Sequence, residues 1–265
     1  MKTAHRAGLR ILVGAGSFAD AAAGLRIVEQ FPRIFFAGLG GILVEEVDMI
    51  ATSQIPNQRI VLLSGKTALA PSHAQLRSHL RADARAFRRV LARVATPHGT
   101  QWTFMQDKGE LVQTALRAAA GWDVLVLGYR HLHRIPGKII VLQTSRNPSV
   151  EMEEASSRLS KQLSAERIVF SVRQNGEKAI GARASKNLQF DTLDDALRAL
   201  TRQNAQVVLA EFQGGPLHSQ TDLLRLLEAA RCPVVVFGAS DTGSLLEHNT
   251  HFPPVANKTD NDTDV

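Results

Sequence analysis

Small residues that follow two apolar runs come nearest to the spacing of a ligand site. Leu9–Val13 is followed by Gly14, Gly16 and Ser17, and Val124–Leu127 is followed by Gly128. Glycine lets the backbone approach a ligand closely, and the amides that open a helix bind phosphate. The first set also has the G-x-G-x-x-A spacing of dinucleotide sites, but the acid expected at the end of the next strand is missing. We predict a crevice at these residues, while helix packing with a Ser17 cap explains them more simply.

Basic residues come directly after Gly128. They are Arg130, His131, His133 and Arg134. A position beyond the carboxyl end of a strand is where open α/β sheets place ligands, so Arg130 and His131 are candidates for binding an anion. A solvated basic linker explains the same cluster and is the commoner case. No third ligand has a defined spacing to the His-x-His pair, so no metal site is predicted.

The segment 72–95 repeats arginine along an amphipathic helical pattern. It contains Arg77, Arg81, Arg85, Arg88, Arg89 and Arg93, with Asp83 as its single acid. Such a stripe could dock on phosphates or on an acidic protein. No aromatic residues are interleaved with it, so a solvated face is favoured and no nucleic-acid partner is expected.

Catalytic motifs are missing from the sequence. It contains no G-x-S-x-G or H-E-x-x-H motif and no pair of carboxylates in a plausible cleft. Its single cysteine, Cys232, precedes a proline and an apolar run, where cysteine is normally an inert small hydrophobe. We therefore predict no catalytic residue, and the balance favours a protein that is not an enzyme.

Short β-rich runs alternate with helical patterns, which is typical of β-α-β units around a parallel sheet. The predicted strands are Leu9–Val13, Ile34–Ala37, Trp102–Met105 and Val124–Leu127, then Lys138–Leu142, Ile168–Val172, Val207–Ala210 and Val234–Phe237. We predict an α/β protein of two parallel-sheet units, at residues 8–136 and 137–238, and a flexible acidic tail at 239–265. Exposed strand edges favour pairing either between the two units or across a homodimer.

Composition limits the surroundings and the partners. The chain has 265 residues, 44% of them apolar, and no run long enough to predict a membrane span. One cysteine fits a reducing compartment, so we expect a soluble protein of the cytoplasm. Five acids and one lysine give the tail a net charge of −4. Because the whole chain carries +6, the remaining chain carries +10.

Several segments, taken in order, resemble the universal stress protein family in its tandem form. They are "LRILVGAGS", "GGILVEEVDMI", "LRADARAFRRVLARVA", "WDVLVLG" and, near the end, "DLLRLLEAARCPVVVFG". The resemblance covers about residues 8–238 and implies two adenine-nucleotide α-hydrolase-like, Rossmann-type units. It also implies an ATP site at the end of the first strand and in a glycine loop after the strand that ends at Gly128.

The departures from the family pattern decide the expected function. The first strand ends without the acid of ATP-binding members, and the segment after Gly128 lacks the second and third glycines of G-x2-G-x9-G-[ST]. The helix and strand that complete a unit are also missing before Lys138. We expect a non-catalytic regulatory or interaction module that has lost ATP and uses no cofactor, acting as a homodimer or with another protein. The alternative is a sensor that binds ATP, AMP or another anion at the Gly14/Gly128 crevice.

Overall fold

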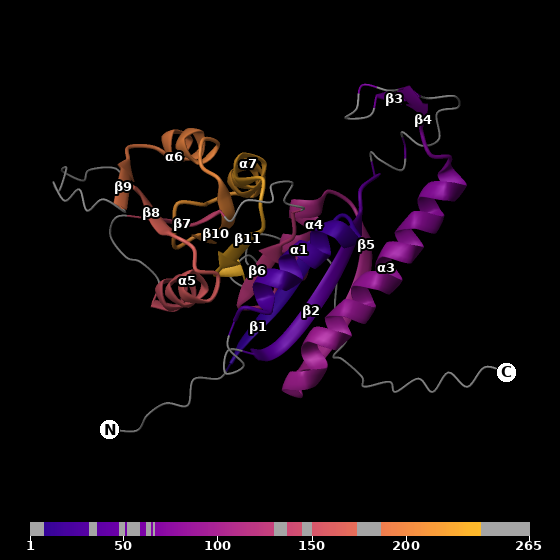
Figure 1. Ribbon diagram of the computed structural model, residues 1–265, viewed down its shortest axis with the longest axis horizontal. Coiled ribbons are helices and arrows are strands. Elements are labelled where there is room, and N and C mark those ends of the chain that lie inside the picture. The colour runs from indigo at the N-terminus through magenta and orange to yellow at the C-terminus, as the bar shows by residue number, and fades with distance from the viewer. Residues whose placement is uncertain are drawn as a thin grey trace.

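A computed structural model describes residues 8–31, 36–47, 51, 59–61, 65, 67–129, 137–144, 150–173 and 187–239. One sheet of nine strands forms its centre, in the order β5-β2-β1-β6-β11-β10-β7-β8-β9 (Figure 1). These strands are β1 (Leu9–Ala15), β2 (Phe36–Glu45), β5 (Gln101–Lys108), β6 (Val124–Leu127), β7 (Lys138–Thr144), β8 (Arg167–Val172), β9 (Asn187–Phe190), β10 (Ala205–Glu211) and β11 (Val234–Phe237). A separate antiparallel hairpin joins β3 (Arg59–Val61) to β4 (Thr67–Leu69).

The sheet consists of two parallel groups that meet antiparallel. The strands β5, β2, β1 and β6 run parallel to one another, as do β11, β10, β7, β8 and β9. The groups join where β6 pairs antiparallel with β11, with Val234 opposite Leu127 and Phe237 opposite Val124. The predicted α/β class and parallel sheets are therefore confirmed. One edge strand of each group, β6 and β11, pairs with the other within the chain, while β5 and β9 form the outer edges of the sheet. The unit boundary at residues 136 and 137 stays a prediction.

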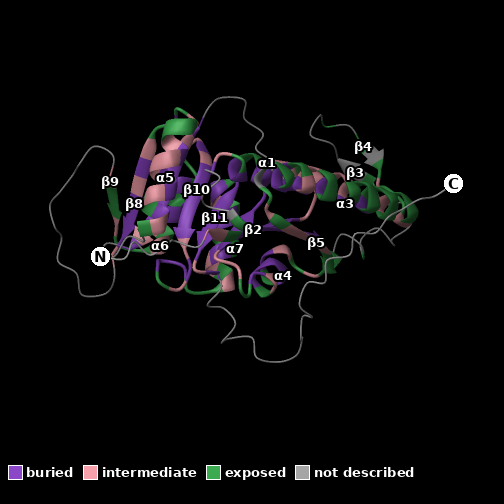
Figure 2. Ribbon diagram, turned by 90° about the horizontal axis from the view of Figure 1, so that it is seen from below, coloured by how far each residue is buried: buried purple, intermediate pink, exposed green. Residues whose placement is uncertain are grey.

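Helices cover both faces of the sheet (Figure 2). They are α1 (Phe18–Val28), α3 (His73–Ala95), α4 (Leu111–Ala118), α5 (Val150–Gln162), α6 (Leu193–Leu200) and α7 (Gln220–Ala230). Apolar side chains of α1, α3 and α5 enter the core on one face, and those of α4, α6 and α7 enter the core on the other. Strand residues alternate between the faces, as Ile11 and Val13 against Leu12 show. Each core contains residues of both parallel groups, so the hydrophobic interior is continuous across the join.

Strand β2 differs from the prediction in its position. The sequence predicted a strand at Ile34–Ala37, but the structure forms it at Phe36–Glu45, through a glycine-rich run. Glycine weakens strands unless a neighbour needs its space. A Cβ on Gly40 would lie 2.6 Å from the Trp122 ring, and one on Gly41 would lie 3.0 Å from Phe87. The glycines therefore make room for aromatic side chains that pack on β2 from both faces.

Side-chain caps define several helix starts. Ser72 and Gln75 form a capping box at the start of α3, and the Thr192 hydroxyl accepts from the Asp195 amide at the start of α6. Apart from Ala239, the predicted tail at 239–265 lies outside the described residues. In the described part of the chain, no helix combines the length and hydropathy that a bilayer crossing requires.

The reactivity of the Cys232 thiol reports how often this part of the core opens to solvent. Its side chain has no exposed surface, and burial raises the pKa of its thiol to about 12. We expect labelling by a disulfide reagent at pH 8 to be at least about a hundredfold slower in the native protein than in 6 M guanidinium, because the thiolate forms only when the core opens. Comparable rates in the two states would show that the join near β11 opens readily.

Candidate functional site

A cavity of about 760 Å³ opens at the carboxyl ends of the first parallel group. Loops after β1, β2, β5 and β6 contribute to it, together with one side of α7. Its lining consists of Gly16, Ser17, Asp20, Glu46, Val47, Gly109, Glu110, Leu111, Val112, Gln113, Gly128, Tyr129, Gln220, Leu224 and Leu227. The fold thus brings Gly16, Ser17 and Gly128 to one cavity. That these residues bind a cofactor stays a prediction. Gly14 lies just behind them, and Arg130 and His131 fall outside the described residues.

The first turn of α1 at this cavity is closed by side chains of the protein itself. Ser17 is the N-cap, and its Oγ accepts from the Asp20 amide at 3.2 Å while lying 2.5 Å from Asp20 Oδ2. The Phe18 amide donates to Asp83 Oδ2 of α3 at 3.0 Å. Two carboxylates therefore lie at the positive end of the α1 dipole, where an anionic ligand would otherwise bind.

The Ser17–Asp20 pair is a helix cap and not an activated nucleophile. The same arrangement opens α6, where the Asp195 amide donates to Thr192 Oγ1 at 3.1 Å. It also opens α7, where the Asp222 amide donates to Ser219 Oγ at 3.1 Å. A geometry that recurs at three helix starts has a structural cause, because each cap satisfies an amide that the helix leaves without a partner.

The glycines at the cavity differ in what they do. A Cβ on Gly128 would lie 2.3 Å from the Asp20 carbonyl oxygen, so this glycine lets α1 pack against the end of β6. A Cβ on Gly14 would lie 3.0 Å from the Ala115 side chain of α4. At Gly16, by contrast, the nearest atom would be Glu46 Oε1 at 3.9 Å. Packing accounts for Gly14 and Gly128, and only Gly16 faces open space.

The described ionisable groups that line the cavity are acidic. Asp20, Glu46 and Glu110 contribute carboxylates, and no lysine, arginine or histidine is among the described lining residues. Gln220 of α7 donates to Glu110 Oε2 at 3.3 Å, which ties the second half of the chain to the cavity wall. Leu111, Val112, Leu224 and Leu227 supply an apolar side. Sequence inspection missed Glu46, Glu110 and α7 as parts of this cavity, because no local pattern reports which loops meet.

A carboxylate also lies at the carboxyl end of β10 in the second parallel group. Glu211 ends β10, and burial, together with the nearby charge of Glu151 on α5, raises the pKa of its carboxyl above the usual value. Gly214 and Gly215 follow in the loop, and a Cβ on Gly215 would lie 2.5 Å from the Glu211 carbonyl oxygen. This loop is therefore folded back on the end of its own strand.

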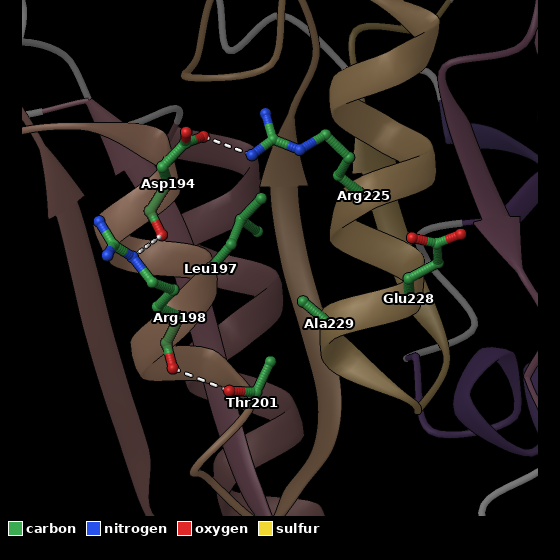
Figure 3. Close-up of a pocket in the computed structure, with 7 residues that line it drawn as sticks. All are labelled: Asp194, Leu197, Arg198, Thr201, Arg225, Glu228 and Ala229. Atoms are coloured by element: carbon green, nitrogen blue, oxygen red, sulfur yellow. Dashed lines mark hydrogen bonds and ion pairs between the residues drawn. The ribbon is translucent and has the colours of Figure 1, made fainter.

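A second, shallower hollow of about 540 Å³ lies between α6 and α7 (Figure 3). Its two arginines are paired within the protein: Arg225 donates to Asp194 at 2.5 Å, and Arg198 donates to Asp195 at 2.6 Å. Among the described residues, no cluster of three or more metal-ligating side chains is found. The hollow is therefore a seam between two helices that the Arg225–Asp194 ion pair bridges, and we assign it no ligand.

Comparison with known proteins reveals a likeness of structure only. No protein-family model and no curated protein matches this chain. Three solved structures are similar to it. A universal stress protein from Archaeoglobus fulgidus aligns at TM-score 0.47 and 9% identity, covering 88% of this chain and 98% of its own. A protein named as a universal stress protein from Pseudomonas aeruginosa aligns at 0.43 and 11%, covering 89% and 95%. A protein of unknown function from Pseudomonas aeruginosa aligns at 0.40 and 12%, covering 88% and 94%.

Two of these three proteins carry the name of the family that the sequence resembles. The printed names describe those proteins and give no ligand, reaction or partner for this chain. The composition of the cavity is therefore the guide to its chemistry.

Substitutions at two cavity glycines should separate packing from ligand space. We expect Gly128→Ala to lower the free energy of unfolding by about 2 kcal/mol or more, because the new Cβ would push α1 away from β6. Gly16→Ala should change it by less than about 1 kcal/mol, because the space is open. Urea unfolding of both variants measures the difference, and equal losses would contradict the packing assigned to Gly128.

The raised pKa of Glu211 gives stability a pH dependence of known sign. The folded state holds the Glu211 proton more tightly than the unfolded state, so this group favours folding at low pH and loses that contribution as pH rises through its folded pKa. We expect Glu211→Gln to raise the free energy of unfolding at pH 7 and to give no gain below pH ~4. Glu154→Gln on α5 is the control, because Glu154 is paired with Arg158 and its removal should give no gain. An unchanged pH profile in Glu211→Gln would show that this carboxyl titrates normally.

Proposed function

We propose that this chain is a universal-stress-type, non-catalytic regulatory or interaction module whose nucleotide site is lost. The observation that carries the proposal is the contact between the Phe18 amide and the Asp83 carboxylate at 3.0 Å. A phosphate cradle needs amides at a helix start that are available to the ligand. Here the carboxylate oxygen of α3 occupies the place that a phosphate oxygen would take.

The charge of the cavity supports the same proposal. Its described ionisable groups are Asp20, Glu46 and Glu110. Two like unit charges 5 Å apart repel by about 3 kcal/mol at an effective dielectric constant of ~20, so each carboxylate near a triphosphate would weaken binding substantially. A protein that excludes nucleotide in this way resembles the family in fold while acting through its surfaces.

Isothermal titration with ATP and with AMP, each with Mg²⁺, tests the proposal. We expect no binding tighter than about 1 mM for the wild-type chain. Asp83→Ala removes the competing carboxylate and should gain measurable affinity for ATP, because the Phe18 amide then becomes available. Asp191→Ala, which removes an exposed carboxylate from an ion pair with Arg173 in the other half, is the control of equal charge and should gain none.

A second candidate is a sensor that binds a nucleotide or another anion at the same cavity. It is favoured by the cavity's volume of about 760 Å³ and by its place at the carboxyl ends of parallel strands. Arg130 and His131 would supply the positive charge. Micromolar, stoichiometric binding of ATP or AMP to the wild-type chain would overturn the first proposal. Loss of that binding in Arg130→Ala/His131→Ala would then establish the second.

A further inference from the structure

Arginines cover the outward face of α3. Figure 1 shows this long helix along the outer side of the first parallel group. The arginines are Arg77, Arg81, Arg85, Arg88, Arg89 and Arg93, and all six are exposed. At a rise of 1.5 Å per residue they extend over about 24 Å, and the first four lie within an arc of about 80°. The opposite side of the helix carries Leu80, Phe87 and Leu91 into the core. The helix therefore presents a straight basic row to solvent.

These six arginines make no ion pair with any residue in the described part of the chain. Several arginines elsewhere do: Arg117 with Asp107, Arg158 with Glu154, Arg198 with Asp195 and Arg225 with Asp194. Single exposed arginines without an ion pair also occur, such as Arg26 and Arg202, but α3 gathers six of them on one helix.

The one acid of α3 does not relieve the charge of this row. Asp83 is partly buried, and its carboxylate accepts from the Phe18 amide of α1. Arginines four residues apart lie next to each other on a helix and repel, as Arg77, Arg81 and Arg85 do here. A face with this repulsion and no internal counter-charge is complementary to a row of negative charges on a partner.

The residues around the arginine row limit the class of partner that it can bind. None of the exposed large apolar residues lies on α3, which disfavours insertion of this helix into a membrane surface. Among the described residues no exposed phenylalanine or tryptophan is available to stack on the bases of a single strand. Residues four apart on the helix are about 6 Å apart, which suits a regular series of phosphates. The complementary surface is therefore a row of backbone phosphates, which the arginines can bind without contacting the bases.

We propose that the arginine face of α3 binds the phosphodiester backbone of a nucleic-acid duplex without reading its sequence. The sequence alone favours a solvated face and no nucleic-acid partner. The structure changes that balance because it ties Asp83 to the Phe18 amide and shows no ion pair between these arginines and an acid of the described residues. The binding surface is separate from the cavity, so it does not depend on the proposed loss of nucleotide.

Fluorescence anisotropy with a labelled 24-base-pair DNA duplex of mixed sequence tests the proposal on the full chain. We expect micromolar binding at 50 mM salt. Four phosphate contacts predict that the logarithm of the association constant falls with the logarithm of salt with a slope of about −3.6. A second duplex of unrelated sequence should bind within about twofold, because the contacts are to the backbone.

Two variants of equal charge separate the row from the overall charge of the protein. The first is Arg77→Gln/Arg81→Gln/Arg85→Gln/Arg88→Gln, and the control is Arg117→Gln/Arg158→Gln/Arg198→Gln/Arg225→Gln. We expect the first to weaken binding at least about tenfold and to flatten the salt slope by about 3 units, while the control changes affinity less than about threefold. Circular dichroism checks that both remain folded. If the first does not fold, Arg81→Gln alone should still reduce the slope by about one unit.

Three outcomes would overturn the proposal. The first is that the wild-type chain does not bind the duplex at 50 mM salt. The second is that both quadruple variants weaken binding equally. The third is that polyglutamate competes as well as unlabelled duplex at equal charge concentration, which would assign the row to an acidic protein partner. Competition by the duplex alone supports the proposal.

Discussion

The antiparallel pairing of β6 with β11 is the constraint on which the rest of the structure depends. Each of these strands has four residues, all buried, and each has a parallel neighbour on its other side. Breaking this join would expose backbone groups of two central strands and divide both hydrophobic cores. The pairing also explains why the first half needs no further helix and strand after Gly128. The second half supplies the neighbour that β6 requires.

Because strand direction reverses at this join, the carboxyl ends of the first parallel group lie beside the amino ends of the second. The cavity at Gly16 and Gly128 therefore cannot merge with the loop after Glu211 into one large site. Each end is closed in its own way, by Asp20 and Asp83 at α1 and by the folded-back glycine loop after β10. The described charged groups of the cavity are carboxylates, although the chain as a whole is basic with a net charge of +6.

Helix α3 carries its carboxylate, Asp83, on the inner side and its arginines on the outer side. Its inner side packs Phe87 and Leu91 against Gly41 of β2, and Phe87 meets Phe104 edge-on with ring centroids 5.3 Å apart. Asp83 lies at the border of this apolar side and ties α3 to the start of α1. Only arginine, histidine and small or polar residues are left for the outer side. One helix thus fills the core, closes the start of α1 and forms the basic surface of the protein.

Several features of this protein could be determined from the sequence by itself. Val124–Leu127 and Val234–Phe237 are predicted as strands with the bounds that the structure has, because short, uninterrupted β-branched and leucine runs are typical of buried strands. The Ser17 cap and the position of α3 follow from equally local signals, since caps and helical periodicity are specified within a few residues.

Only the tertiary structure decided what those elements meet. It placed β2 in a glycine run whose side-chain space Trp122 and Phe87 fill, and it chose β11 as the partner of β6. It also brought Asp83 to the Phe18 amide, 65 residues away in the chain. These outcomes depend on packing between distant segments, and the free energy of such packing belongs to no single stretch of sequence. At the start of α1, for example, the packing of two helices brings a carboxylate of one segment to an amide of another.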